Sequence, residues 1–126
     1  MDTRTPLSRV RGLGSAKSGT THWWMQRITA AALIPLSYWL LKLLDLSATA
    51  SYEQTQTWLS QPFNTVGVLA FILAVFYHAA LGLRVVIEDY VGTESGKIVL
   101  IWLVNLVFVV LTLTALLAVV RSLQTG

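Results

Sequence analysis

The stretch NTVGVLAFILAVFYHAALGLRVVIEDYVG, residues 64–92, decides the fold. From Asn64 to Leu83 it carries no charge and one histidine, His78. A run of this length is typical of a helix that crosses a bilayer, whose hydrocarbon core takes roughly 20 residues to span. The run ends in a charged and aromatic cluster formed by Arg84, Glu88, Asp89 and Tyr90. The stretch therefore predicts a membrane helix with an imidazole inside it and with carboxylates and a phenol at one end.

The composition indicates an integral membrane protein. Of the 126 residues, 55% are hydrophobic and 12% are charged, whereas a soluble domain usually carries about 25% charged residues. The charges lie mostly outside three apolar blocks, residues 28–41, 64–83 and 98–120. The chain contains no cysteine, so it cannot form disulfides or hold an iron–sulfur cluster through thiolates. Any redox group would need nitrogen or oxygen ligands.

We therefore predict an all-α membrane protein with one membrane-anchor domain over residues 1–126. Three transmembrane helices are expected at about residues 24–46, 62–91 and 97–121, after a polar arm over residues 1–21. None of the three apolar runs has a polar face, which distinguishes them from the amphipathic helices of soluble proteins.

Local signals predict how these helices bend and end. Pro35 should kink the first helix, which packed membrane helices tolerate. Residues 45–63 read as a polar connection that rests on the membrane interface through Tyr52 and Trp58. Gly92 should stop the second helix.

The charge distribution predicts the topology. The formal net charge of +3 comes mostly from the N-terminal arm, and residues 45–63 carry no basic residue. Cytoplasmic flanks are enriched in Lys and Arg, so we expect a cytoplasmic N-terminus and a periplasmic C-terminus, and no nucleic-acid binding. The arm and first apolar block, with Ala48-Thr49-Ala50, also mimic a cleavable signal peptide. Lys42 and Asp45 interrupt the approach to that site, which favours a retained helix.

Small residues and the histidine form one stripe along the second helix. Their spacing of three and four residues lets another helix or a flat cofactor approach the backbone closely. His78 should lie near the bilayer midplane, where an ionisable group is costly and by default marks a functional site. Two roles fit it: a packing hydrogen bond to a neighbouring helix, which is the commoner case, or ligation of a metal such as haem iron. The stripe consists of Gly67, Ala70, Ala74, His78 and Gly82.

The end of the same helix places acidic groups where the helix dipole is unfavourable to them. Arg84 can pair with Glu88 four residues later, but Asp89 has no such partner within the helix. Asp89 follows His78 by eleven residues and so returns to nearly the same face, about 16 Å along the axis. With Tyr90 it could serve an apolar ligand that needs protons and hydrogen bonds, or it could be an ordinary solvated helix end. Arg27 should lie at the same level and could bind lipid phosphate, a haem propionate or part of a quinone site.

These residues resemble a known family. The pattern of His78 followed by Asp89-Tyr90, in YHAALGLRVVIEDYVG, is similar to the second helix of the small hydrophobic membrane anchor of succinate dehydrogenase, which is respiratory complex II. Residues 18–36, SGTTHWWMQRITAAALIPL, look like the entry to the first span in alphaproteobacterial and mitochondrial-type members. The resemblance covers most of residues 15–120.

The resemblance implies a partnership and a haem. It implies that the chain packs with a second three-helix anchor, the cytochrome b subunit, and that together they hold one haem b. His78 would be one axial ligand of the haem iron, and the second would come from the partner. The flavoprotein subunit would oxidise succinate, and electrons would pass through the iron–sulfur subunit. The complex would lie in a bacterial inner membrane, with the mitochondrial inner membrane as the second choice.

The resemblance also assigns roles at the membrane surface. Tyr90 would hydrogen-bond a ubiquinone carbonyl, and Asp89 would deliver protons. Arg27 would lie near the haem propionates and the quinone pocket. Two alternatives stay open: an anchor of a quinol:fumarate reductase, and a purely structural anchor without haem, since some complex II relatives lack it.

Overall fold

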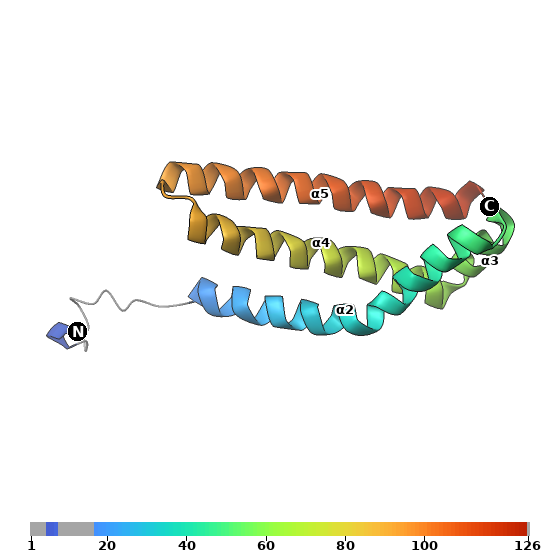
Figure 1. Cartoon of the computed structure of the whole chain (residues 1–126), viewed down its shortest axis with the longest axis horizontal. Coiled ribbons are helices and arrows are strands. Elements are labelled where there is room, and N and C mark those ends of the chain that lie inside the picture. The colour runs from blue at the N-terminus through green and yellow to red at the C-terminus, as the bar shows by residue number, and fades with distance from the viewer. Residues whose placement is uncertain (1–4, 8–16, 126) are drawn as a thin grey trace.

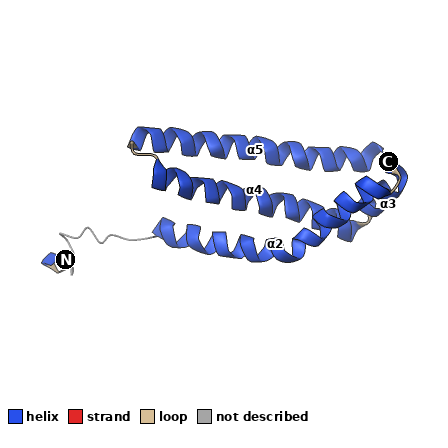
Figure 2. Cartoon of the chain, in the orientation of Figure 1, coloured by secondary structure: helices blue, strands red, loops and turns tan. Residues whose placement is uncertain are grey.

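A computed structural model describes residues 5–7 and 17–125, which are helical over almost all of the second range (Figure 2). Most of the polar arm expected over residues 1–21 therefore lies outside the described residues. Within residues 17–125 the helices are α2 (Lys17–Thr49), α3 (Tyr52–Ser60), α4 (Pro62–Tyr90) and α5 (Glu94–Thr125).

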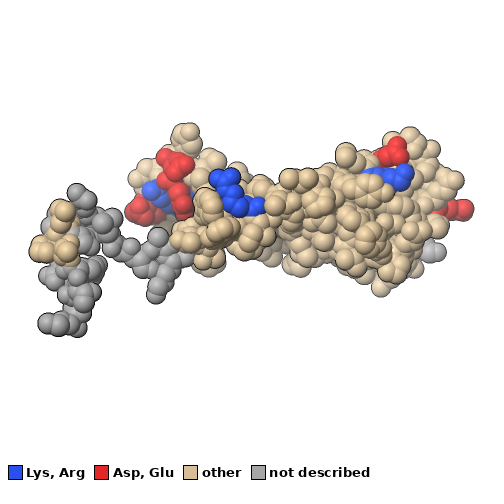
Figure 3. Space-filling view, turned by 90° about the horizontal axis from the view of Figure 1, so that it is seen from below, with Lys and Arg blue, Asp and Glu red and all other residues tan. Residues whose placement is uncertain are grey.

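Three of these helices are long and apolar enough to cross a membrane. They cover Gly19–Thr49, Pro62–Tyr90 and Glu94–Thr125. On the face shown in Figure 3, acidic and basic side chains gather toward the two ends, and a broad band between them carries no charge. The prediction of an all-α protein with three apolar helices is thus confirmed.

The central helix of the bundle is α4, which packs against α2 on one side and α5 on the other. The three long helices run side by side with alternating direction, so α2 begins at one end of the bundle and α5 finishes at the other (Figure 1). The C-terminal end of α4 lies at the same end of the bundle as the start of α2. The two helices thereby bring Arg27 and the Asp89–Tyr90 pair to one end of the molecule.

Helix α2 is bent in its second half (Figure 1). Pro35 lies inside the same half of the helix. Proline has no N–H to donate to the preceding turn and its ring crowds the carbonyl there, so a bend is expected. The Ser37 hydroxyl donates to the carbonyl of Leu33, four residues earlier, at 2.5 Å, and such a bond also favours bending of a helix. Pro35 thus tilts the C-terminal part of α2 across the start of α4.

The contact between the bent part of α2 and α4 is built around Trp39. Its indole packs edge-to-face on Phe63, with ring centroids 5.3 Å apart. Its Nε1 donates to the side-chain oxygen of Asn64 at 3.3 Å, and Asn64 is buried. Gly67 lies directly against the ring. Part of the small-residue stripe on α4 therefore serves the packing of α2, within the same chain.

The connection between α2 and α4 differs from its expected form, because it contains a helix. Ser51 accepts from the backbone N–H of Gln54, and Gln54 accepts from the backbone N–H of Ser51. This reciprocal capping box satisfies two helix N-terminal donors and favours helix formation. Gln56 is buried and donates to the carbonyl of Ser122, whose hydroxyl donates back to Gln56 at 2.7 Å. Helix α3 is therefore fastened to the last turn of α5.

The turn between α4 and α5 is short and differs slightly from expectation. Val91 leaves the helix with extended backbone angles, φ −90° and ψ 121°, directly after Tyr90. The helix thus ends two residues before Gly92. The Thr93 hydroxyl accepts from the N–H of Gly96 at 3.2 Å and so caps α5.

Candidate functional site

The histidine of α4 faces α2 in the middle of the bundle. Its Nδ1 lies 3.0 Å from the hydroxyl oxygen of Thr29. Thr29 is 8% exposed, whereas His78 is half-buried. Its other ring nitrogen, Nε2, has no hydrogen-bond partner within residues 17–125. One edge of the imidazole is therefore engaged inside the chain, and the other remains available to a group from outside it.

The Thr29–His78 contact is the deepest part of a polar seam between α2 and α4. On α2, His22, Gln26 and Thr29 follow at steps of four and three residues and so share one face. On α4 the facing polar residues are His78 and Arg84. These five residues are called the polar seam below. The seam runs from the end of the bundle to His78, through helices that are otherwise apolar.

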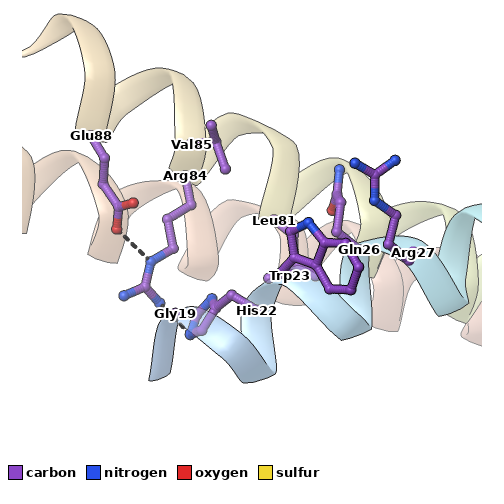
Figure 4. Close-up of a pocket in the computed structure, with 9 residues that line it drawn as sticks. All are labelled: Gly19, His22, Trp23, Gln26, Arg27, Leu81, Arg84, Val85 and Glu88. Atoms are coloured by element: carbon purple, nitrogen blue, oxygen red, sulfur yellow. Dashed lines mark hydrogen bonds and ion pairs between the residues drawn. The ribbon is translucent and has the colours of Figure 1, made fainter. Parts of the chain in front are cut away.

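The outer part of the seam is organised by Arg84. Its Nη1 lies 3.4 Å from Nε2 of His22, and its Nε donates to Glu88 at 3.0 Å (Figure 4). Because a guanidinium can only donate, Nε2 of His22 must be the acceptor in the first contact. The predicted pairing of Arg84 with Glu88 is confirmed. Arg84 thereby connects the start of α2 to the last turns of α4.

Between the two contacts of the seam lies Gln26. Its side chain passes the backbone of Gly82, where a Cβ would come within 3.7 Å of the amide nitrogen. Its Oε1 is buried and has no hydrogen-bond partner among the described residues. Buried polar atoms are normally paired, so this oxygen is an exception among the described residues.

A cavity of about 430 Å³ opens along this outer part. Arg27 lines it from α2, and its guanidinium lies 5.4 Å from the ring centroid of Trp23, over the indole. Such a cation–π contact holds the charge near the rim of the site. In Figure 4 the guanidinium of Arg27 lies on the side of Trp23 away from Arg84. The lining residues are Gly19, His22, Trp23, Gln26, Arg27, Leu81, Arg84, Val85 and Glu88.

The acid–phenol pair lies at the surface of this chain. Asp89 is exposed, and Tyr90 is 84% exposed. Neither makes a hydrogen bond or an ion pair with the part of the chain that the structure describes, and neither lines the cavity. The structure thus groups Arg27 with the seam and His78 with Thr29. The remaining expected site, Asp89 with Tyr90, lies at the end of α4, and no other described residue covers it.

The ligands that this chain can offer to a metal are few. In residues 5–7 and 17–125 no three His, Cys, Asp or Glu side chains lie close enough together to hold a bare metal ion. A single imidazole suffices only when the other ligands come from elsewhere, as for iron in a porphyrin. His78 fits that requirement because its Nε2 has no hydrogen-bond partner in residues 5–7 and 17–125.

Sequence reasoning missed Thr29, His22 and Gln26 as members of the site. A signal was present, because these three residues make a polar stripe at helical spacing on a mostly apolar helix. What the stripe faces depends on how α2 and α4 pack, which the spacing does not specify.

Comparison with known proteins agrees with these features. Residues 1–118 match the family described as succinate dehydrogenase/fumarate reductase transmembrane subunit. A succinate dehydrogenase hydrophobic membrane anchor subunit of Rickettsia bellii is 37% identical over 119 residues, covering 94% of each chain. A succinate dehydrogenase membrane anchor subunit of Reclinomonas americana is 35% identical over 96 residues, covering 72% of this chain and 78% of the relative.

A third relative, from Paracoccus denitrificans, is a succinate dehydrogenase hydrophobic membrane anchor subunit that is 31% identical over 97 residues, 75% of each chain. These relatives match along most of their own length, and the family match includes the site residues of both α2 and α4. The resemblance expected from His78 and the Asp89–Tyr90 pair is confirmed: the chain belongs to the family of succinate dehydrogenase/fumarate reductase transmembrane subunits.

Proposed function

We propose that this chain is the anchor subunit of a succinate:quinone oxidoreductase that helps to bind haem b and forms part of the ubiquinone-reduction site. The observation that carries the proposal is the placement of His78. It is a half-buried imidazole in the middle of an apolar helix, with one ring nitrogen unoccupied, in a chain of this family. The packing contact with Thr29 occupies Nδ1 alone, so it is compatible with iron binding through Nε2.

His78 would be one ligand of the haem iron, binding through Nε2, and a second anchor subunit would supply the other ligand. When bound, the haem carries one electron reversibly. The work of this chain's residues is to hold the imidazole in place and to exclude water around it through the apolar faces of α2 and α4.

At the end of α4, Tyr90 and Asp89 would serve the quinone. The phenol O–H of Tyr90 can donate to a quinone carbonyl and so orient the ring. Reduction of a quinone to a quinol takes up two protons, and Asp89 is a carboxyl group that can hold and transfer one at the membrane surface. Both side chains are exposed in the single chain, so the pocket would be closed by the iron–sulfur subunit and the second anchor subunit.

Arg27 would provide a positive charge at the same end of the bundle. It lies beside the cavity that also contains His22 and Arg84, and three nitrogen-bearing side chains there suit a carboxylate such as a haem propionate.

The names of the relatives support one direction of the reaction. Their names specify succinate dehydrogenase, and this favours succinate oxidation over the fumarate reductase that the family description also covers. The flavoprotein and iron–sulfur subunits would bind at the end of the bundle that carries Asp89 and Tyr90. In our proposal this end lies on the cytoplasmic side of a bacterial inner membrane.

The test is purification from native membranes through an affinity tag on the partner flavoprotein. We expect four subunits, succinate-dependent reduction of ubiquinone and a low-spin b-type haem spectrum. His78→Ala should remove the haem or convert it to a different spectrum. His22→Ala, which changes the other histidine of the chain, should retain the low-spin spectrum, because the loss of a contact to a propionate leaves both ligands of the iron in place. A complex without haem, or an unaltered haem in His78→Ala, would contradict the proposal and leave a structural anchor.

A further inference from the structure

The hydroxyl of Thr29 is surrounded by three groups that could receive its single hydrogen. The carbonyl of Met25 lies at 2.7 Å, the carbonyl of Gln26 at 3.2 Å and Nδ1 of His78 at 3.0 Å. A carbonyl oxygen can only accept, so the short contact with Met25 requires the hydroxyl to donate there. The hydrogen of Thr29 is therefore committed to its own helix.

The hydrogen bond from Thr29 to Met25 determines whether Nδ1 of His78 donates or accepts in its contact with Thr29. With its hydrogen on the Met25 carbonyl, Thr29 presents a lone pair to Nδ1 at 3.0 Å. Two facing lone pairs would repel, so the contact is favourable only when Nδ1 carries the hydrogen and donates it. In a neutral imidazole one ring nitrogen is protonated and the other is not. Nε2 must then hold the free lone pair.

We propose that Thr29 is the positioning residue for His78, and that it fixes the tautomer and the ring orientation that leave Nε2 free to bind iron. This inference rests on the proposed role of His78 as a haem ligand. Ligating histidines commonly donate their other ring N–H to an oxygen of the protein, and this partner fixes the tautomer and ring orientation and raises the basicity of the ligating nitrogen. Thr29 is such a partner, supplied by a different helix of the same chain.

Two features of the contact argue against an incidental neighbour. Thr29 is 8% exposed and its own polar hydrogen is already satisfied inside α2, so its stability within the helix does not require His78. Nδ1 of His78, in contrast, has no second partner among residues 17–125. Thr29 therefore has a hydrogen-bond partner in its own helix, whereas Thr29 is the one partner of Nδ1 among these residues.

The test replaces Thr29 in the complete complex. Thr29→Val preserves the shape of the side chain but removes the acceptor, and Thr29→Ser restores it. We expect Thr29→Val to lower haem affinity roughly 10- to 100-fold, the usual effect of losing such a partner. The readouts are haem per complex, the rate of haem loss to apomyoglobin, and the low-spin g values of the oxidised haem by electron paramagnetic resonance. Thr29→Ser should return all three toward wild type.

The matched control is Thr112→Val in α5. Thr112 is also part-buried and donates to a carbonyl four residues earlier, that of Phe108 at 2.6 Å, but it does not contact His78. The Thr112→Val substitution should leave haem content and g values unchanged. Should Thr29→Val fail to assemble, Thr29→Cys replaces the hydroxyl with a weak acceptor of similar size and should show the same changes.

The outcomes separate this inference from the function on which it rests. Haem lost in His78→Ala, but retained with wild-type g values in Thr29→Val, would overturn the positioning role alone. A wild-type complex without b-type haem would overturn both. Haem loss in Thr29→Val that Thr29→Ser does not reverse would show that the hydroxyl is not the cause, and would also overturn the positioning role.

Discussion

The indole ring of Trp39 lies so close to the backbone of Gly67 that a Cβ at residue 67 would overlap three of its ring atoms. This contact lets the bent part of α2 cross the beginning of α4 at close range. Trp39 is also held on two other sides, by Phe63 and by the side chain of Asn64. The ring therefore has little freedom to move away from an added methyl group.

Gly67→Ala should destabilise the anchor. Overpacking of a filled contact typically costs about 1–3 kcal/mol, and here the ring would have to give up its bond to Asn64 to make room. We expect less assembled complex and a lower temperature of thermal inactivation for the purified complex. Gly92→Ala is the control, because nothing lies within 4 Å of a Cβ there. Equal stability of Gly67→Ala and Gly92→Ala would mean that the two helices do not cross at this distance.

Tyr90→Phe should reduce ubiquinone turnover and leave assembly and haem intact. The substitution removes one hydrogen-bond donor from an exposed side chain, and one lost hydrogen bond of about 0.5–1.5 kcal/mol corresponds to a decrease of up to roughly tenfold. Succinate oxidation with a soluble dye as acceptor should stay at the wild-type rate. Tyr38→Phe, which changes an exposed tyrosine on α2, is the control. Normal ubiquinone reduction in Tyr90→Phe would remove this residue from the quinone site.

Asp89→Asn should make ubiquinone reduction more dependent on the proton concentration of the solution. Without the carboxyl group, protons must come from bulk water, so the rate should fall below that of the wild type and the deficit should widen as the pH rises. The measurement is the ratio of variant to wild-type rates across a pH series. Asp45→Asn, which changes an acid at the opposite end of the bundle that pairs with Lys42 at 3.6 Å, should give a flat ratio. A flat ratio for Asp89→Asn as well would contradict proton delivery.

Single cysteines should report the orientation of the bundle, since the natural chain contains none. Ser95→Cys places a thiol in the first turn of α5, near the α4–α5 turn, and Thr57→Cys places one on an exposed face of α3. In intact cells, a membrane-impermeant maleimide should label Thr57→Cys and spare Ser95→Cys. Labelling of Ser95→Cys alone would reverse the proposed topology and place the quinone site on the outer side. Detergent lysis, after which both should react, is the control for thiol accessibility.

Much of the fold could be predicted because its signals are local. The uncharged runs around His78 and before Arg121 are each long enough to cross a bilayer, and three such runs predict three helices. The Arg84–Glu88 pair follows from a spacing of four residues on one helix. Asp89 and Tyr90 were found by their distance along the same helix from His78, with a family resemblance to assign them a function.

Helix α3 is harder to predict from the sequence, because a local capping box and a distant contact both stabilise it. The Ser51–Gln54 capping box is visible in the sequence, but the polar composition of residues 45–63 predicts a connection without a helix. The fastening of Gln56 to Ser122 spans 66 residues, and no local pattern shows it. A nine-residue helix is too short to be stable alone, so this distant contact explains why the connection is helical.

What the sequence alone determined is the set of long helices and the positions of His78, Asp89 and Tyr90 along one of them. These follow from hydrophobic length and helical spacing, because a backbone in lipid must satisfy its hydrogen bonds within each segment. Only the tertiary structure decided that Thr29, 49 residues earlier in the chain, lies against the imidazole. That pairing depends on which faces of two apolar helices pack together, and small residues such as Gly67 and Gly82 permit the approach without specifying the partner.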